Sequence, residues 1–192
     1  HTAYRRQRQM CIRDRFAALP KKRQTLLFSA TFSEAIRTLA GEMLRDPLSI
    51  EVSPRNAAAK SVKQWLIPVD KKRKAELFLH LYRSKKWSQV LVFVKTRKGV
   101  DELEEVLLAA GIKADAIHGD KPQPTRLRAL QRFKAGEVDV LVATDVAARG
   151  LDIDDLPLVV NFDLPIVAED YVHRIGRTGR AGATGQAVSL VC

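Results

Sequence analysis

The sequence lacks several features that would assign it to whole classes of protein. It has only two cysteines, Cys11 and Cys192, which lie near opposite ends and give neither a metal-ligand spacing nor a disulfide framework. No apolar run approaches the length of a membrane span, and no secretory signal pattern opens the chain. The phosphate-binding pattern G-x-x-x-x-G-K-[ST] is also absent, because no glycine is followed by lysine. These absences predict a cytoplasmic protein from a reducing compartment, with no membrane partner.

The net charge of +11 is unevenly distributed along the chain. Residues 1–23 hold eight basic residues and one acid, so most of the excess positive charge lies there. Global charge is therefore weak evidence for nucleic-acid binding. Residues 4–15, YRRQRQMCIRDR, have neither strand alternation nor an apolar helical face. We interpret residues 1–15 as a non-native or disordered basic tail, with an RNA-binding arm as the alternative.

The next part of the chain predicts a strand, a helix and a second strand. TLLFSAT at 25–31 is a short apolar run typical of a buried strand. Ser33 can cap a following helix, and SIEV at 49–52 indicates a short strand. The apolar face of the helix would consist of Ile36, Leu39, Ala40 and Met43. Residues 54–61 are small and polar, as is typical of a linker.

From residue 62 onward, apolar strands alternate with amphipathic helices. Strands are expected at 62–69, 90–95, 113–119, 138–144, 158–163 and 186–191, and helices at 71–86, 97–110 and 123–135. Residues expected to face inward are Leu77, Phe78, Leu81, Val100, Leu103, Leu107, Ala110, Leu127, Leu130 and Phe133. The basic run Lys71 to Lys74 is interpreted as an exposed helix start. This pattern indicates an α/β fold, a parallel sheet with helices on both faces, whose ligands bind beyond the carboxyl ends of the strands.

A basic segment with two glycines, HRIGRTGR, occupies residues 173–180. Arg174, Arg177 and Arg180 recur every third residue, so in a helix or tight turn they would lie roughly on one side. Guanidinium groups grip phosphate oxygens in bidentate fashion, and glycines let a backbone pass close to a ligand. Taken alone, the segment fits either phosphate binding or a solvated basic loop.

Five motifs occur in order along the chain. They are SAT at 29–31, LVFVKT at 91–96, HGD at 118–120 followed by Gln123 and Arg126, VATDVAARGLDI at 142–153, and HRIGRTGR at 173–180. Together they resemble the C-terminal half of a DEAD-box ATP-dependent RNA helicase of superfamily 2. The sequences in and around the motifs are most similar to the bacterial RhlE-type branch. The resemblance implies that 16–53 ends a first RecA-like domain, that 54–61 links the domains, and that 62–192 is a second RecA-like domain truncated at its C-terminus.

The resemblance also implies which residues serve ATP. Arg177 and Arg180 match the arginine fingers that stabilise charge on the γ-phosphate. The other implied residues are His173 and Arg174 as positioning groups, Asp152 with Gly150 at the nucleotide, and Ser29 with Thr31 as the motif that couples hydrolysis to strand separation. On the residues alone, Ser29 and Thr31 fit ordinary strand-end capping equally well.

A second implied set lies along RNA. It comprises Thr96, Arg97, Gly119, Gln123, Arg126, Thr144, Asp145 and Gly150. Hydroxyls, glycine amides and arginines suit phosphates and 2′-OH groups, so the resemblance implies binding of single-stranded or duplex RNA without base readout. Pro122 and Pro124 flank Gln123 and depart from the family pattern, which predicts a stiffer loop.

The missing phosphate-binding loop limits what the chain is expected to do. Mg²⁺ would be bound together with ATP through acids of the first domain that this sequence does not contain. We interpret Asp152, Asp154 and Asp155 as a solvated loop rather than a metal site. The chain is expected to be a helicase fragment that alone neither hydrolyses ATP nor unwinds RNA. The alternatives are a stand-alone RNA-binding module and a DNA-acting superfamily 2 relative. Ribosome-assembly or RNA-degradation factors are candidate partners.

Overall fold

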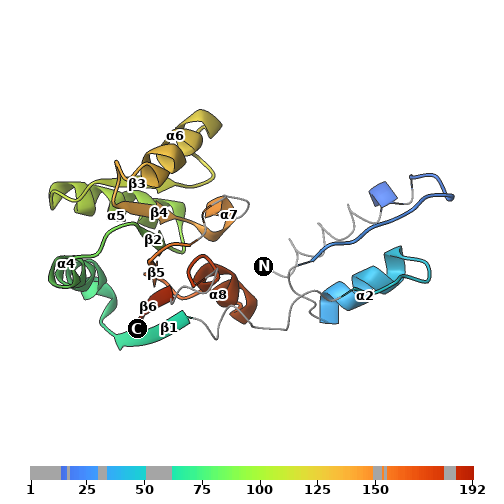
Figure 1. The fold of residues 1–192 in the computed structure, drawn as a ribbon, viewed down its shortest axis with the longest axis horizontal. Coiled ribbons are helices and arrows are strands. Elements are labelled where there is room, and N and C mark those ends of the chain that lie inside the picture. Colours follow the sequence, from blue (N-terminus) through green and yellow to red (C-terminus); the bar gives the residue numbers. More distant parts are fainter. Residues whose placement is uncertain are drawn as a thin grey trace. The chain divides into compact units, whose positions relative to one another are not determined.

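The computed structural model describes residues 14–16, 18–29, 34–50, 62–148, 153, 155–179 and 185–192. The chain divides into two compact units, residues 1–55 and 56–192, which are described separately (Figure 1). The linker expected at 54–61 lies outside the described residues, as does most of the basic tail. In the described ranges, every helix is too short or too polar to cross a lipid bilayer.

The first unit contains helix α2 (Glu34–Met43). This confirms the predicted helix, although its proposed cap, Ser33, lies outside the described residues. The expected apolar face is the half-buried one, and consists of Ile36, Leu39, Ala40 and Met43. The spacing of apolar residues therefore identified both the helix and its inward side.

The two strands predicted for the first unit are not formed in its described residues, so that prediction is wrong there. Residues 25–29 and 49–50 have no regular structure, and the remainder of each predicted strand lies outside the described residues. Phe28 is 90% exposed, and Leu26 and Ile50 are also exposed. A strand needs neighbouring strands for its backbone hydrogen bonds. The described part of this unit offers none, so apolar sequence alone does not produce a strand.

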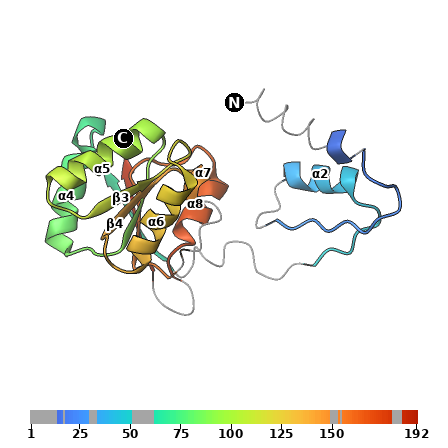
Figure 2. The ribbon, with the colours of Figure 1, turned by 90° about the horizontal axis from the view of Figure 1, so that it is seen from above.

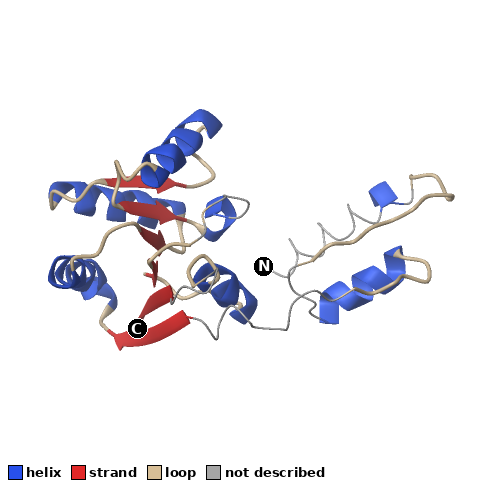
Figure 3. Cartoon of the chain, in the orientation of Figure 1, coloured by secondary structure: helices blue, strands red, loops and turns tan. Residues whose placement is uncertain are grey.

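The second unit is built on a six-stranded parallel sheet in the order β1-β6-β5-β2-β4-β3 (Figure 3). The strands are β1 (Val62–Pro68), β2 (Val90–Phe93), β3 (Ala114–Ile117), β4 (Val140–Ala143), β5 (Leu158–Asn161) and β6 (Gly185–Val191). In the centre, Val92 of β2 is paired with Val142 of β4 and Val160 of β5. Strands β2, β4 and β5 are buried throughout, which confirms the predicted α/β class.

Helices cover both faces of this sheet (Figure 2). They are the 3₁₀ turn η1 (Lys71–Arg73) and the α-helices α4 (Lys74–Lys85), α5 (Arg97–Ala109), α6 (Gln123–Lys134), α7 (Asp145–Ala148) and α8 (Ala168–Ile175). One core contains Phe78 of α4 and Leu107 of α5 against the sheet. A second core, on the opposite face, contains Phe133 of α6 and Ala147 of α7. Ile175 of α8 packs on Ala187, and neighbouring side chains alternate along β6, so α8 lies on the face away from α4.

Two predicted orientations are wrong. Leu127 was expected to face inward on α6 but is 52% exposed. The inward stripe of α6 passes through positions 126, 129, 130 and 133, which is the i, i+3, i+4, i+7 pattern, and Leu127 falls beside it. Lys74 was expected to be exposed with the other basic residues at the helix start but is buried. Its burial results from partners at the end of β5, described below.

Candidate functional site

The candidate site lies at the carboxyl edge of the sheet, where β2, β3, β4 and β5 end. Because these strands are parallel, their carboxyl ends share one edge, and the loops that follow them gather there. These loops carry Thr96, Gly119, Thr144 and Asp163. Strands β2 and β4 are continuous apolar runs, so the first polar residues after them mark the edge.

Arg174 is the buried anchor of this edge, with 2% of its surface exposed. Its Nε and Nη2 donate to the two carboxylate oxygens of Asp145 at 2.6 and 2.7 Å. Its Nη1 donates to the side-chain oxygen of Asn161 at 3.0 Å and to the backbone carbonyl of Asp163 at 2.5 Å. The guanidinium carbon lies 4.9 Å from the ring centre of Phe93. This bidentate, charge-assisted geometry fixes α8 against the ends of β4 and β5.

The segment that follows α8 is held by backbone contacts and by a close approach to β6. Thr178 donates its hydroxyl hydrogen to the carbonyl of Leu156, whose own N–H donates to the carbonyl of Arg177 at 3.1 Å. A Cβ added to Gly185 would lie 2.4 Å from both the nitrogen of Gly179 and the hydroxyl oxygen of Thr178. Only glycine at this position allows β6 to lie so close to the segment.

The predicted nucleotide residues are only partly within the described structure. Arg177 is half-buried at the end of α8, and His173 is exposed on the same helix. Ser29 belongs to the first unit and is half-buried there. Four further residues of the predicted set lie outside the described residues: Thr31, Gly150, Asp152 and Arg180. The positioning role of Arg174 stays a prediction, and its described hydrogen bonds are to residues of the second unit.

Three predicted RNA-binding residues lie close together where β2 and β3 end. The Thr96 hydroxyl oxygen accepts the N–H of Gly99 at 3.1 Å and so caps α5. Arg97 and Asp120 form an ion pair whose two side chains are each 61% exposed. A Cβ on Gly119 would lie 3.8 Å from the Arg97 guanidinium. The pair therefore links the start of α5 to the loop after β3, on the surface.

The buried side chain of His118 fixes the loop after β3 to α5. His118 is buried, and its Nε2 lies 2.9 Å from a carboxylate oxygen of Asp101. The N–H of Asp120 points to His118 Nδ1 at 3.4 Å, so the ring lies between α5 and the backbone of the loop. Lys121 adds an ion pair to Glu104 at 2.9 Å. The backbone around Gly119 and the Arg97–Asp120 pair remain exposed.

Gln123 and Arg126 occupy the first turn of α6. Gln123 is exposed and Arg126 is half-buried. Pro122 stands at the N-cap without a side-chain capping bond, as expected for a residue that has no side-chain acceptor. Within the described part of the chain, the Arg126 Nε is the one buried side-chain nitrogen or oxygen atom without a hydrogen-bond partner.

An ion pair inside the domain holds α6 to β3. Arg132 Nη1 donates to both carboxylate oxygens of Asp115, at 2.8 and 2.9 Å. Burial raises the pKa of the Asp115 carboxyl above its ordinary value, and the charge of Arg132 opposes part of that rise. The pair orients the helix that carries Arg126.

Thr144 and Asp145 begin α7, and both are engaged within the domain. Thr144 is buried, and its carbonyl accepts the N–H groups of Ala147 and Ala148 at 3.1 and 3.0 Å. Both carboxylate oxygens of Asp145 are occupied by Arg174. An RNA-binding role for Asp145 therefore stays a prediction, and its observed contacts are structural.

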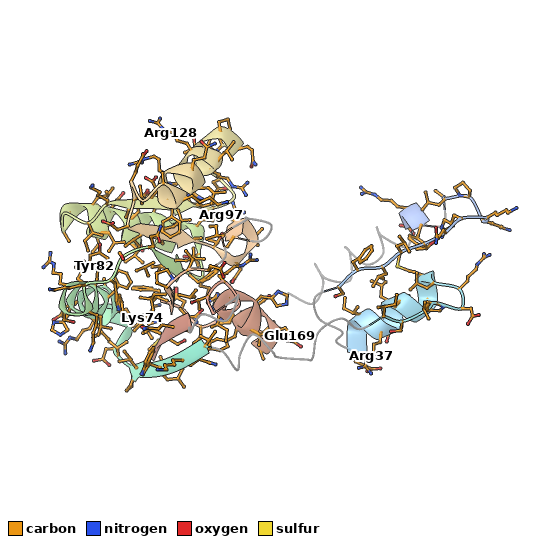
Figure 4. All side chains as sticks on the ribbon, in the orientation of Figure 1. Arg37, Lys74, Tyr82, Arg97, Arg128 and Glu169 are labelled. Carbon is orange, nitrogen blue, oxygen red and sulfur yellow. The ribbon has the colours of Figure 1, made fainter. Side chains whose placement is uncertain are left out.

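One residue that the sequence did not single out proves central to this edge. Lys74 is the first residue of α4, labelled in Figure 4, and is 4% exposed. Its Nζ donates to the carbonyl of Phe162 at 2.8 Å and to the carboxylate of Asp163 at 2.9 Å. The other carboxylate oxygen of Asp163 accepts the N–H of Lys95 at 3.0 Å. Asp163 could be found from its place after a buried strand, whereas nothing in the basic run distinguishes Lys74.

Comparison with known proteins identifies the class of domain that contains this site. Residues 73–182 match the model of the helicase conserved C-terminal domain. This match covers more than half of the chain, which therefore belongs to that family of helicase domains.

Two curated relatives indicate the DEAD-box branch of helicases. The DEAD-box ATP-dependent RNA helicase CshA of Geobacillus kaustophilus is 44% identical over 173 residues, which are 90% of this chain and 37% of the relative. The ATP-dependent RNA helicase RhlB of Pseudomonas syringae is 45% identical over 169 residues, which are 88% of this chain and 43% of the relative. The chain is thus a C-terminal piece of a DEAD-box helicase and spans less than half the length of these relatives.

Solved structures agree with this assignment. The E. coli DEAD-box protein SrmB, solved with regulator of ribonuclease activity A, has a TM-score of 0.64 and 45% identity, covering 68% of this chain and 77% of its own. A variant of S. cerevisiae Dbp5 bound to RNA and ADP BeF3 has a TM-score of 0.81 and 34% identity, covering 94% of this chain and 48% of its own. Both likenesses confirm the RecA-like fold predicted from the sequence.

Proposed function

We propose that this chain supplies the second RecA-like domain, with the end of the first, of an ATP-dependent DEAD-box RNA helicase of the RhlE type in the bacterial cytoplasm. In this proposal residues 16–53 end the first domain, and residues 62–192 form the second. One observation carries it. Arg174 of α8 is joined by its fork to Asp145 at the start of α7, at the carboxyl edge of the sheet where the loops with predicted RNA contacts lie, and the segment with Arg177 directly follows α8.

The proposed role of the α8 segment is to act on ATP. Arg177 and Arg180 would place positive charge on the γ-phosphate as its bond breaks. The glycine contact between Gly179 and Gly185, and the Arg174 fork, support this role because they hold the segment before ATP arrives. Hydrolysis would then require closure of the two domains, since the fingers and the phosphate-binding loop belong to different ones.

Mg²⁺ in this proposal is held by the first domain. Among the described residues no cluster of three potential metal ligands occurs, and three of the six predicted ATP residues of the second unit are arginines, which suit phosphate rather than a cation. When bound, Mg²⁺ would neutralise phosphate charge. This chain contributes the opposite side of the nucleotide site.

The proposed role of the remaining loops is to hold the RNA backbone. The residues assigned to it are Thr96, Arg97, Gly119, Gln123, Arg126 and Thr144. The exposed Arg97 and Gln123, and the buried unpartnered Nε of Arg126, support contacts to phosphates and 2′-OH groups. Binding would be independent of base sequence. The relative SrmB was solved with a regulator of ribonuclease activity, which supports RNA-degradation factors as candidate partners.

The test uses the protein completed with the first RecA-like domain from the same reading frame. Arg177→Ala should lower RNA-stimulated ATP hydrolysis about 10³-fold or more, while nucleotide-free RNA affinity changes less than about twofold. Arg83→Ala, on the exposed face of α4, is the matched control and should change neither. Loss of RNA binding with intact ATPase in Arg177→Ala would contradict the assigned roles.

The same preparation tests the alternatives. The 192-residue chain alone should hydrolyse no ATP, because its sequence lacks the phosphate-binding loop. RNA-stimulated hydrolysis by this chain alone would refute the division of the site between two domains. A completed protein that binds RNA without any ATPase would favour the stand-alone RNA-binding module. Equal stimulation by RNA and by DNA of matched sequence would favour a DNA-acting relative.

A further inference from the structure

Lys74 is an unusual residue to find buried. A lysine ammonium loses much hydration free energy on burial and is therefore buried almost only with partners. Lys74 has two, the carbonyl of Phe162 and the carboxylate of Asp163, and its Nζ lies 5.6 Å from the Phe162 ring centre. The neighbouring Lys71 and Lys72 remain exposed. The start of α4 therefore places one particular ammonium at the end of β5.

Asp163 contacts four residues, which belong to α4, to α8 and to the end of β2. One carboxylate oxygen binds Lys74 of α4, and the other accepts the N–H of Lys95 just after β2. Its backbone carbonyl accepts from Arg174 of α8. The residue itself follows β5 and donates its own N–H to the carbonyl of Phe93 at 3.2 Å. Asp163 is thus the point at which helices from opposite faces of the sheet meet.

Two of the residues that contact Asp163 lie next to the segments proposed to bind RNA and ATP. Lys95 directly precedes Thr96 and Arg97, which are assigned to RNA. Arg174 lies one helical turn before Arg177, which is assigned to ATP. A displacement of the whole of Asp163 would therefore move both segments, because its carboxylate accepts the N–H of Lys95 and its backbone carbonyl accepts from Arg174.

Stability alone does not account for this arrangement. A buried ion pair is often no more stabilising than apolar side chains of the same volume, because the desolvation of both charges offsets their attraction. What apolar side chains cannot do is hold the Lys74 ammonium and the Lys95 N–H in fixed directions, as the Asp163 carboxylate does. The directional contacts of Asp163 indicate a role in geometry.

We propose that Lys74 is a positioning residue: through Asp163 it sets the Thr96 segment and the Arg177 segment relative to each other. This proposal rests on the proposed function for its ATP and RNA readouts. The structural part of the proposal, that Lys74 orders both segments, can be tested in the 192-residue chain without ATP or RNA.

The first experiment measures amide hydrogen exchange in the 192-residue chain with Lys74→Met. The amides of Lys95 and Thr178 should exchange about tenfold faster, whereas that of Val142 in central β4 should change less than about twofold. Lys72→Met, an exposed lysine of the same run, is the matched control and should change none of them. An equal rise at all three amides, or no rise at Lys95 and Thr178, would overturn the proposal.

Asp163→Asn provides the same test if Lys74→Met does not fold. Its amide keeps an acceptor for Lys74 or for the Lys95 N–H but loses the charge that both share. The Lys95 amide should again exchange faster than that of Val142, by about threefold or more. Unchanged exchange at Lys95 would count against the proposal.

The second experiment is a double-mutant cycle in the completed two-domain protein. Lys74→Met should lower RNA-stimulated kcat about tenfold with less than about twofold change in KM for ATP, and adding Asp163→Asn should lower it little further. Additive losses would show that Lys74 does not act through Asp163. An unmutated two-domain protein without RNA-stimulated ATPase would refute the proposed function instead, and the exchange experiment would still decide the role of Lys74.

Discussion

Two arginine–aspartate pairs lie at the carboxyl edge of the same sheet, and they differ mainly in burial. Arg174 and Asp145 are joined in a buried bidentate fork, whereas Arg97 and Asp120 form an exposed pair. A buried fork cannot exchange partners without leaving a charge in the interior, but an exposed pair can do so at small cost. The proposed ATP segment is therefore attached to a fixed contact, and the proposed RNA loop to an exchangeable one.

The largest expected effect comes from breaking each pair in the same way. Arg174→Met should lower the free energy of unfolding by about 2–4 kcal/mol, because the partly buried Asp145 and the fully buried Asn161 lose their partner. Arg97→Met should cost less than about 1 kcal/mol. Urea denaturation of both variants measures the difference, and similar losses in the two would remove the distinction between the pairs.

The next largest effect concerns the glycines that allow close backbone approach next to the ATP segment and in the RNA loop. Gly185→Ala should destabilise the domain by about 1–3 kcal/mol, because its Cβ would overlap the Gly179 backbone. Gly119→Ala is the matched change in the RNA loop, where a Cβ would meet only the Arg97 guanidinium at ordinary contact distance, and should stay within about 0.5 kcal/mol. Thermal unfolding of the two variants gives the comparison. A tolerated Gly185→Ala would show that the segment is not held by close approach.

A smaller effect concerns RNA affinity on the exchangeable side. Arg126→Ala in the completed protein should weaken RNA binding several-fold and reduce the slope of log K against log salt by about one. Arg128→Ala, a neighbouring exposed arginine on α6, should leave the slope within about half a unit. Fluorescence anisotropy over a salt series gives both values. Equal slopes for the two variants would mean that Arg126 contacts no phosphate.

The smallest effect is a gain. Asp120→Asn removes the carboxylate that competes with RNA phosphate for Arg97, so RNA affinity at low salt should rise about two- to fivefold with stability unchanged. Glu102→Gln removes the same charge from the exposed Lys98–Glu102 pair on α5, 3.3 Å apart, and is the control. A rise in both variants would show a general effect of net charge rather than release of Arg97.

The central sheet could be predicted from the sequence because its strands are continuous apolar runs between helices. The same rule failed at 25–29, where the apolar residues are present but the described part of that unit has no neighbouring strand. Helix α8 was not predicted as an element because it is short and its main buried anchor is the charged side chain Arg174. The burial of Lys74 was not predicted because its side chain is also charged. Hydrophobic periodicity counts an arginine or lysine as a surface residue, and only the fold reveals its partners.

The place of β6 has a consequence for how this domain is made. Among the described strands, β1 has β6 as its single neighbour, and β6 also lies between β1 and β5. The first strand of the domain to leave the ribosome therefore has nothing to pair with until residues 185–191 have emerged. Throughout that interval its backbone N–H and C=O groups are open to other chains. Synthesis, more than the finished fold, is the stage at which this domain is vulnerable to misassociation.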